Sequence, residues 1–267
     1  KTNSIVMALE FTDLIIGYKD RSKSQQIAGP FDLKIPEKKL TAVIGKNGSG
    51  KTTLIKTIGQ QLTSLEGDVL LEGQSLKNIP SNQRARLLSF VFTTTFSSEN
   101  MTVNELVALG RYPFLNWYSK PSKKDVECIR EAIVFTALEA LASTKIYALS
   151  DGQKQRAFIA RALAQETPYM ILDEPMSHLD HHHKAQLLSL MKKLVKEKNK
   201  TIVYTTHDIE KAITNADFIL ALTEDKSFFN TPENLIKEGV FDNLFPKEQV
   251  YFDPATTQFL YRDSKSK

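Results

Sequence analysis

A glycine-rich segment at 45–53 carries the residues best suited to chemistry on phosphate groups. It reads Gly-Lys-Asn-Gly-Ser-Gly-Lys-Thr-Thr and matches the pattern G-x-x-x-x-G-K-[ST]. Glycines let the backbone curve so that its N–H groups face an anion. Lys51 supplies a mobile positive charge for the β- and γ-phosphates of a nucleotide, and the Thr52 hydroxyl can ligate Mg²⁺. The predicted nucleotide contacts of this segment are Gly45, Lys46, Asn47, Gly48, Ser49, Gly50, Lys51, Thr52 and Thr53.

The segments on either side are those that a phosphate loop needs. Residues 40–44 form a short apolar run typical of a buried strand, and the apolar spacing of 54–58 predicts one face of a helix. A helix that begins at the loop directs unpaired N–H groups and its positive dipole end towards an anion. The alternative is a glycine turn that happens to carry a lysine, and a chance match would arise on the order of 1% of the time. Nucleotide binding is therefore predicted, but the loop alone does not separate a kinase, a GTPase and a transport ATPase.

Two further polar groups follow apolar runs that predict buried strands. Residues 169–172 lead into Asp173 and Glu174, and residues 201–206 lead into His207. Neighbouring residues of a strand face opposite ways, so Asp173 can reach Mg²⁺ while Glu174 orients or deprotonates a water molecule. Because α/β proteins bind ligands at the carboxyl edge of the sheet, these side chains are predicted to lie there.

A capped helix start at 149–153 is a second potential phosphate site. Ser150 is a good N-cap, and the charge of Asp151 suits the first turn of a helix. An ordinary capped helix has the same features, so this segment alone does not establish binding.

Tyr18 stands at the end of a predicted strand upstream of the phosphate loop. It could stack on a nucleotide base, whereas a lone aromatic residue on a strand is more often part of the core. The residues alone leave both alternatives open.

Composition sets the broad class of protein. The chain has 267 residues, of which 41% are hydrophobic and 25% charged, which is ordinary for one large domain with insertions or two small ones. A net charge of +4 is too small to indicate a nucleic-acid partner. Cys128 is the only cysteine, which excludes an intrachain disulfide and is compatible with a reducing compartment. No apolar run approaches the about 18 residues that span a bilayer, and we expect no signal segment at the start.

Strands are predicted on both sides of a helical stretch. Residues 8–44 and 69–92 contain alternating or short apolar runs typical of strands, whereas 93–98 has no periodicity and predicts a loop. A capping box at 102–105 predicts a short helix that ends at Gly110. A longer helix is predicted after Ser122, with a shared face formed by Val126, Ile129 and Ile133. The pattern favours a helical insertion in an α/β core.

Five motifs in one order resemble those of an ABC-type ATPase subunit, and the resemblance covers about residues 8–225. They are the phosphate loop, Leu-Ser-x-Gly-Gln at 149–153, Leu-Asp-Glu-Pro at 172–175, Ser-His-Leu-Asp at 177–180 and Thr-His-Asp at 206–208. The resemblance implies an α/β fold: an ABC-type P-loop ATPase core, with a RecA-like mixed sheet and an N-terminal antiparallel β subdomain, plus an inserted helical subdomain. The expected domains are 1–92 and 155–230 for the ATP-binding core, 93–154 for the helical signature subdomain and 231–267 for a C-terminal extension. Aromatic residues expected to pack this extension on the core are Phe245, Tyr251, Phe252, Phe259 and Tyr261.

The same resemblance implies ATP hydrolysis at a site shared by two chains. Two copies would pair head to tail, with ATP between the phosphate loop of one copy and Ser150, Gly152 and Gln153 of the other. The implied catalytic residues are Glu174 as base, His207 at the γ-phosphate, and Lys51. The other implied roles are adenine stacking for Tyr18, Mg²⁺ binding for Thr52 and Asp173, and coupling of the two sites for Asp180.

Three positions depart from the family pattern. Thr93 stands where members generally carry a Gln that senses Mg²⁺ and the membrane partner, and it can still offer one oxygen at shorter reach. Asp151 replaces a Gly and places a carboxylate near a triphosphate, which would weaken closure of the dimer unless its side chain points away and leaves the contacts to Ser150 and the backbone at Gly152. Lys46 replaces a Pro without an expected consequence.

Residues 105–113 are similar to those of ATPases that serve iron-chelate, haem and cobalamin importers. This likeness implies a ferric siderophore or haem as cargo, a separate integral membrane permease, and, indirectly, a substrate-binding protein. The loop at 93–100 and the surface around Arg111 to Phe114 are expected to contact the permease at the cytoplasmic face of the inner membrane. One alternative is a nucleotide-gated module with weak or no hydrolysis because of Thr93 and Asp151, and another is a soluble ABC ATPase in cluster assembly.

Four histidines, His178, His181, His182 and His183, raise the question of a metal site. Helical spacing would bring His178 and His182 together, but Zn²⁺ sites need convergent ligands with further support. A solvated helix start with adventitious nickel binding is the favoured interpretation.

Overall fold

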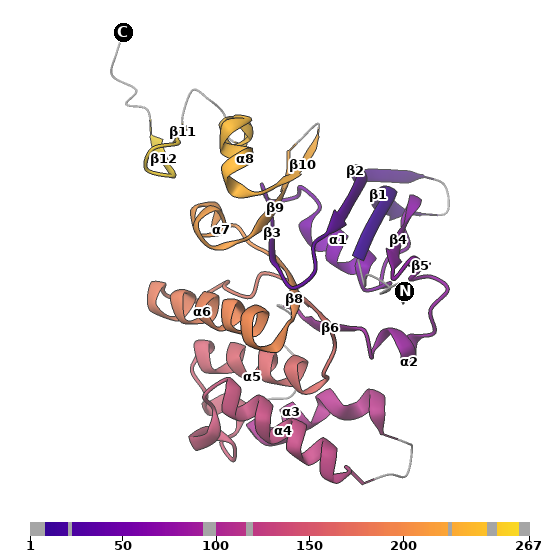
Figure 1. Ribbon diagram of the computed structural model, residues 1–267, viewed down its shortest axis with the longest axis vertical. Helices are drawn as coiled ribbons and strands as arrows, with labels where there is room; N and C mark the ends of the chain where they lie inside the picture. Colours follow the sequence, from indigo (N-terminus) through magenta and orange to yellow (C-terminus); the bar gives the residue numbers. More distant parts are fainter. Residues whose placement is uncertain are drawn as a thin grey trace, which may run out of the picture. The chain divides into compact units, whose positions relative to one another are not determined.

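The computed structural model describes residues 9–20, 23–92, 100–115, 120–223, 226–244 and 250–261 (Figure 1). The chain forms two compact units, of which unit 1 comprises Lys1–Asn78 and Val203–Lys267 and unit 2 comprises Ile79–Ile202. The domain boundaries expected at 92/93 and 154/155 stay predictions. Among the described residues, no helix is both long and apolar enough to cross a bilayer.

An antiparallel sheet forms the first part of unit 1. Its strands, in the order β2-β1-β4-β5, are β2 (Ser24–Ile35), β1 (Leu9–Lys19), β4 (Glu66–Leu71) and β5 (Gln74–Ser75). As the alternating pattern predicted, Phe31 and Ile35 are buried while Asp32 and Lys34 are exposed. Phe31 packs edge-on against Phe11 of β1, with ring centroids 6.3 Å apart.

The second sheet of unit 1 is mixed and holds the phosphate loop at the end of β3, a fully buried strand. Its strands are, in order, β10 (Ser227–Asn230), β9 (Phe218–Leu222), β3 (Leu40–Gly45) and β8 (Thr201–Thr205). β3 is parallel to β9 and buried along its whole length, whereas β10 is antiparallel to β9. The backbone N–H of Thr206 donates to the carbonyl of Val43 at 3.1 Å, which ties the end of β8 to β3. Helices of this unit are α1 (Lys51–Ile58), α7 (Ile209–Asn215), α8 (Pro232–Lys237) and the 3₁₀ helix η4 (Val240–Asn243).

Aromatic side chains pack the C-terminal hairpin of unit 1. Its strands are β11 (Val250–Asp253) and β12 (Gln258–Tyr261). Phe252 lies between Phe241 of η4 and Phe259 of β12, with ring centroids 5.0 and 5.1 Å apart. Tyr251 and Tyr261 are exposed, contrary to expectation. Phe245 lies outside the described residues.

Unit 2 combines two parallel strands with several helices. The strands are β6 (Leu88–Val91) and β7 (Tyr169–Leu172). The helices are α2 (Ser81–Arg84), α3 (Val103–Ala108), α4 (Lys123–Phe135), α5 (Asp151–Ala164), α6 (His181–Lys198) and the 3₁₀ helices η1 (Leu109–Phe114), η2 (Glu139–Leu141) and η3 (Ile146–Ala148). Thr201 and Ile202 of β8 also belong to this unit, and the N–H of Thr201 donates to the carbonyl of Pro168 at 2.9 Å.

The helix starts of unit 2 lie where the sequence predicted them, whereas the predicted helix end and buried face are only partly correct. Complete capping boxes begin α3 at Thr102 and α4 at Ser122. The expected end of α3 at Gly110 is wrong, because the chain continues as η1 and Gly110 packs where an added Cβ would clash with the carbonyl oxygen of Arg161. Ile129 and Ile133 are buried as predicted, but Val126 is 57% exposed.

Arg111 organises this helical part from inside. Its guanidinium lies 2.8 Å from carboxylate oxygens of both Asp125 and Glu166 and donates to the carbonyl of Ala164 at 2.7 Å. The ring of Phe114 covers the guanidinium at 4.1 Å. Only 2% of Arg111 is exposed, so the expectation that it forms part of a contact surface is wrong.

Candidate nucleotide-binding site

The phosphate loop connects β3 to α1 through left-handed backbone that requires glycine. Gly48 and Gly50 have φ angles of 81° and 100°. At Gly50 an added Cβ would also lie 3.0 Å from Cγ2 of Ile27 and 3.4 Å from Cβ of Ala28, both on β2. The glycine spacing thus fixes the curve of the loop, and β2 of the antiparallel sheet packs against the loop at Gly50.

Donor groups gather where the loop meets α1. The helix has no side-chain cap and no acidic residue in its first turn, so its N-terminal N–H groups face no carboxylate of their own helix. Lys51 is 4% exposed, and its Nζ donates to the carbonyls of Gly45 at 2.8 Å and Lys46 at 2.9 Å. The Ser49 hydroxyl is buried without a hydrogen-bond partner among the described residues. These features fit a polyphosphate, which would satisfy the hydroxyl and the helix end together.

Tyr18 lies beside the start of α1. The residue is 47% exposed, and its hydroxyl is 3.3 Å from Oγ1 of Thr53. This exposure excludes the core position left open by the sequence and fits a ring available for stacking. Thr52, the predicted Mg²⁺ ligand of α1, is also exposed.

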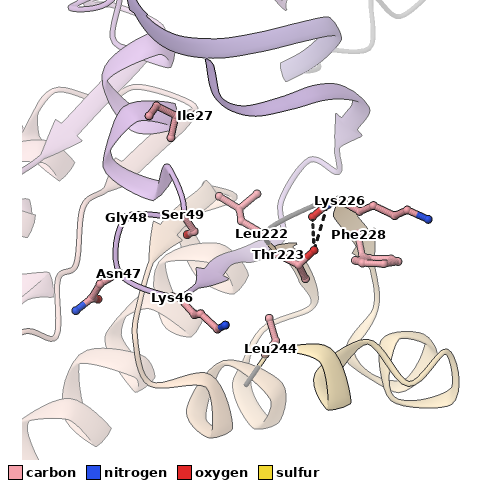
Figure 2. A pocket seen from close by; sticks show the side chains of 10 residues that line it. All are labelled: Ile27, Lys46, Asn47, Gly48, Ser49, Leu222, Thr223, Lys226, Phe228 and Leu244. Carbon is pink, nitrogen blue, oxygen red and sulfur yellow. Dashed lines mark hydrogen bonds between the residues drawn. The ribbon is translucent and has the colours of Figure 1, made fainter. Parts of the chain in front are cut away.

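An open cavity of about 640 Å³ lies beside the loop. Figure 2 shows the side chains that line it. Loop residues 46–49 line one side, and Leu222, Thr223, Lys226 and Phe228 are among the residues that line the other. Hydrogen bonds between Thr223 and Lys226 connect the residue after β9 with the residue before β10. The volume is typical of small-molecule sites. Tyr18 and Lys51 do not line this cavity, so it adds space next to the loop but is not the whole site.

His207 follows β8 in a turn that its neighbours fix. The N–H of Asp208 donates to Oγ1 of Thr206 at 3.0 Å, and Asp208 caps α7 and pairs with Lys211 at 2.8 Å. His207 itself is exposed. The sequence predicted this placement at the end of a strand.

In unit 2 the predicted carboxylates follow β7 directly. Asp173 is 5% exposed, and its N–H donates to the carbonyl of Val91 at 2.8 Å. Glu174 has a φ of 45°, a left-handed conformation that is unfavourable for a residue with a Cβ. Ser177 donates from its hydroxyl to Oε2 of Glu174 at 3.0 Å. Sequence reasoning placed Ser177 in a motif but missed its contact with Glu174, although the spacing of three residues was a possible signal.

The predicted N-cap of α5 is confirmed, and it forms a reciprocal capping box. The Ser150 hydroxyl accepts from the N–H of Gln153 at 3.3 Å, and the Gln153 amide oxygen accepts from the N–H of Ser150 at 2.9 Å. Gly152 lies against the imidazole of His183. Asp151 is exposed, with its carboxylate 3.9 Å from Nζ of Lys154.

Metal ligands were considered at two places. The described parts of the chain hold no group of three or more His, Cys, Asp or Glu side chains placed to bind a metal ion, and this includes the histidines at 178–183. Thr93, the other predicted ligand of Mg²⁺, lies outside the described residues.

A phosphate loop between a buried parallel strand and an uncapped helix defines a P-loop nucleotide-binding protein. Residues 29–177 match the family described as ABC transporter, which is more than half of the chain. The chain therefore belongs to the ABC transporter family and is an ABC ATPase, as the order of its motifs predicted.

Relatives and solved structures agree with this assignment. The petrobactin import ATP-binding protein FpuD of Bacillus anthracis is 35% identical over 92% of this chain and 90% of its own length. The ferric enterobactin transport ATP-binding protein FepC of Escherichia coli is 36% identical over 90% of this chain and 88% of its own. A metal-chelate type ABC transporter in an inward-facing conformation is similar with a TM-score of 0.77, 26% identity and 95% coverage of both chains. A dimeric bacterial ABC transporter cassette gives a TM-score of 0.72 and 27% identity over 84% of this chain and 98% of its own.

Proposed function

We propose that this chain is the ATP-hydrolysing subunit of an importer and energises uptake of an iron chelate through a separate membrane permease. The observation that carries the ATPase part is the phosphate loop, where Lys51, an uncapped helix start and the Ser49 hydroxyl, which has no partner in the described part of the chain, converge. The cargo rests on relatives named for petrobactin and ferric enterobactin, so a ferric siderophore is favoured over haem.

The chain's own residues take separate parts in the proposed reaction. Tyr18 stacks on adenine, and Lys51 and the loop N–H groups hold the phosphates. Glu174 accepts the proton of the attacking water, and its contact with Ser177 holds the carboxylate in place. His207 contacts the γ-phosphate.

Mg²⁺ is the proposed metal of the site, with Thr52, Asp173 and Thr93 as its ligands. Hydroxyl and carboxylate oxygens suit this hard cation. When bound, the ion neutralises charge that develops on the phosphates.

The proposed partners are a second copy of the chain and an integral membrane permease, with a substrate-binding protein acting through the permease. In the head-to-tail dimer, Ser150, Gly152 and Gln153 of one copy cover the nucleotide on the loop of the other. The similar cassette described as dimeric supports pairing of such domains. The proposed location is peripheral, at the cytoplasmic face of the inner membrane.

The testing experiment has two parts. Steady-state ATP hydrolysis is measured on the purified chain, alone and with its co-expressed permease, and we expect turnover that the permease stimulates. A strain that lacks this chain is then given ferric siderophore or haem as the only iron source, and we expect loss of growth on the siderophore. Absence of turnover in both preparations would favour the nucleotide-gated module, and normal growth on both iron sources would exclude the importer.

A further inference from the structure

His183 joins two segments of unit 2 that the proposed function brings to the nucleotide. The first is the start of α5, where Gly152 packs under the imidazole. A Cβ added at Gly152 would clash with Cδ2 of His183 and lie 2.9 Å from its Cγ and 3.2 Å from its Nε2. Gly152 has no positive φ angle, so the backbone conformation does not require glycine here. Glycine is needed because the ring occupies the space of a side chain.

The second segment is the loop before α6, which ends at Asp180. Nδ1 of His183 lies 2.9 Å from Oδ1 of Asp180, and the same oxygen accepts from the backbone N–H of His183 at 2.8 Å. These hydrogen bonds lower the pKa of the Asp180 carboxyl. An ionised carboxylate can only accept, so Nδ1 carries the proton of this contact.

Capping of α6 does not explain the histidine. Asp180 caps the helix through the backbone N–H of residue 183, which any residue except proline would supply. Only the ring makes the two side-chain contacts, one edge on the Asp180 carboxylate and the other against Gly152. A side chain of the same size without Nδ1 would keep the second contact and lose the first.

We propose that His183 is a positioning residue that clamps the signature turn at 150–153 to Asp180, so that both segments reach the partner's nucleotide as one rigid piece. The inference rests on the proposed function, because it assigns His183 to the site shared by two copies. Misplacement of a positioned group by about 1 Å costs on the order of 10²-fold in rate. Loss of the clamp therefore lowers the rate of hydrolysis and not the affinity of a single chain for ATP.

Three variants of the full chain test the clamp. His183→Ala removes both contacts, His183→Asn keeps a donor for Asp180 without the ring, and His183→Phe keeps a ring over Gly152 without the donor. We expect kcat to fall at least about tenfold in all three, with ATP affinity of the single chain within about twofold of wild type. His181→Ala is the matched control, because His181 is exposed on the same turn, and it should retain wild-type kcat. Wild-type kcat in either His183→Asn or His183→Phe would overturn the clamp, because one contact would then suffice.

A double-mutant cycle with Gly152→Ala gives a readout that a loss of folding would not produce. If the added Cβ acts by displacing the imidazole, Gly152→Ala should cost severalfold less in kcat when His183 is already Ala. Equal losses in both backgrounds would overturn the inference.

ATP-dependent dimerisation of the same variants carrying Glu174→Gln supplies a second measurement, and we expect half-maximal dimerisation to require at least about fivefold more ATP. Dimerisation at wild-type ATP concentrations would count against the clamp. The proposed function is tested separately, by the wild-type chain. It fails if the wild-type chain neither hydrolyses ATP nor dimerises in the presence of ATP.

Discussion

The ammonium group of Lys51 lies 2.8 Å from the carbonyl oxygen of Gly45, at the opposite end of the phosphate loop. With its second bond to the carbonyl of Lys46, this contact closes the loop on its own lysine. A charge-assisted hydrogen bond to phosphate is stronger than one to a neutral carbonyl, so a polyphosphate can draw the ammonium away from the loop. Before the ligand binds, the lysine therefore stabilises the curve of the loop. After binding, it stabilises the bound phosphates.

Lys51→Ala should weaken ATP binding by about 10- to 150-fold, because it removes a charged donor worth roughly 1.5–3 kcal/mol. It should also lower the thermal stability of the chain without nucleotide, since the loop loses two hydrogen bonds. Titration with a fluorescent ATP analogue and thermal unfolding measure the two effects. Lys56→Ala, in the last turn of the same helix, is the control that should leave affinity unchanged. Wild-type affinity in Lys51→Ala would contradict the role of this lysine.

Tyr18→Ala should lower ATP affinity by about 5- to 150-fold, because stacking of a base on an aromatic ring contributes roughly 1–3 kcal/mol. Tyr18→Phe should stay within about twofold of wild type, because the exposed ring makes the stack, whereas the hydroxyl contacts Thr53. Inorganic tripolyphosphate provides a matched probe without a base. Its affinity should not change in Tyr18→Ala, and an equal loss for both ligands would argue for a distorted loop.

Glu174→Gln should lower ATP turnover at least about 10²-fold, as expected when a general base is removed. The amide keeps the size of the side chain and still accepts from Ser177, so ATP-dependent dimerisation should persist. Phosphate release and light scattering measure turnover and dimerisation. Near-normal turnover would exclude Glu174 as the base.

Asp125 should contribute a pH-dependent part of the stability of unit 2. Hydrogen bonds from Ser122, followed by the contact with Arg111, lower the pKa of its carboxyl from 3.8 to about 2. Because the folded chain binds this proton more weakly than the unfolded chain, the contribution is complete above about pH 4 and disappears as the pH falls towards 2. The difference in free energy of unfolding between wild type and Asp125→Asn should therefore shrink between pH 4 and pH 2 in urea titrations. A difference that stays constant over this range would refute the assignment.

Local signals account for most of what the sequence predicted of the fold. The strand before the phosphate loop, the capping box at Thr102, the helix start after Ser122 and the alternation in β2 each depend on residues within about four positions. Arg111 could not be placed this way, because its partner Glu166 lies 55 positions away and a charged residue is normally exposed. Gly110 was misread for the same reason, since the need for glycine comes from Arg161 of another helix.

The candidate site also contains features that neighbouring residues predicted and contacts that they did not predict. The phosphate loop, the carboxylates after β7 and the N-cap at Ser150 were all found from their neighbours in sequence. The contact of Ser177 with Glu174 and the packing of His183 on Gly152 were not, because they depend on side-chain direction and on the meeting of separate helices. Joint binding of one Mg²⁺ by Thr52 and Asp173 stays a prediction.

The packing of β2 on Gly50 has a consequence for how this protein can be altered. Ile27 and Ala28 occupy the space next to the glycine, so bulk added to either side chain would press on the backbone that surrounds the phosphates. Nucleotide affinity then becomes sensitive to residues that never meet the nucleotide. A shortened chain that lacks β1 and β2 would keep the complete sequence of the phosphate loop. It would lose the packing that holds the loop in its shape.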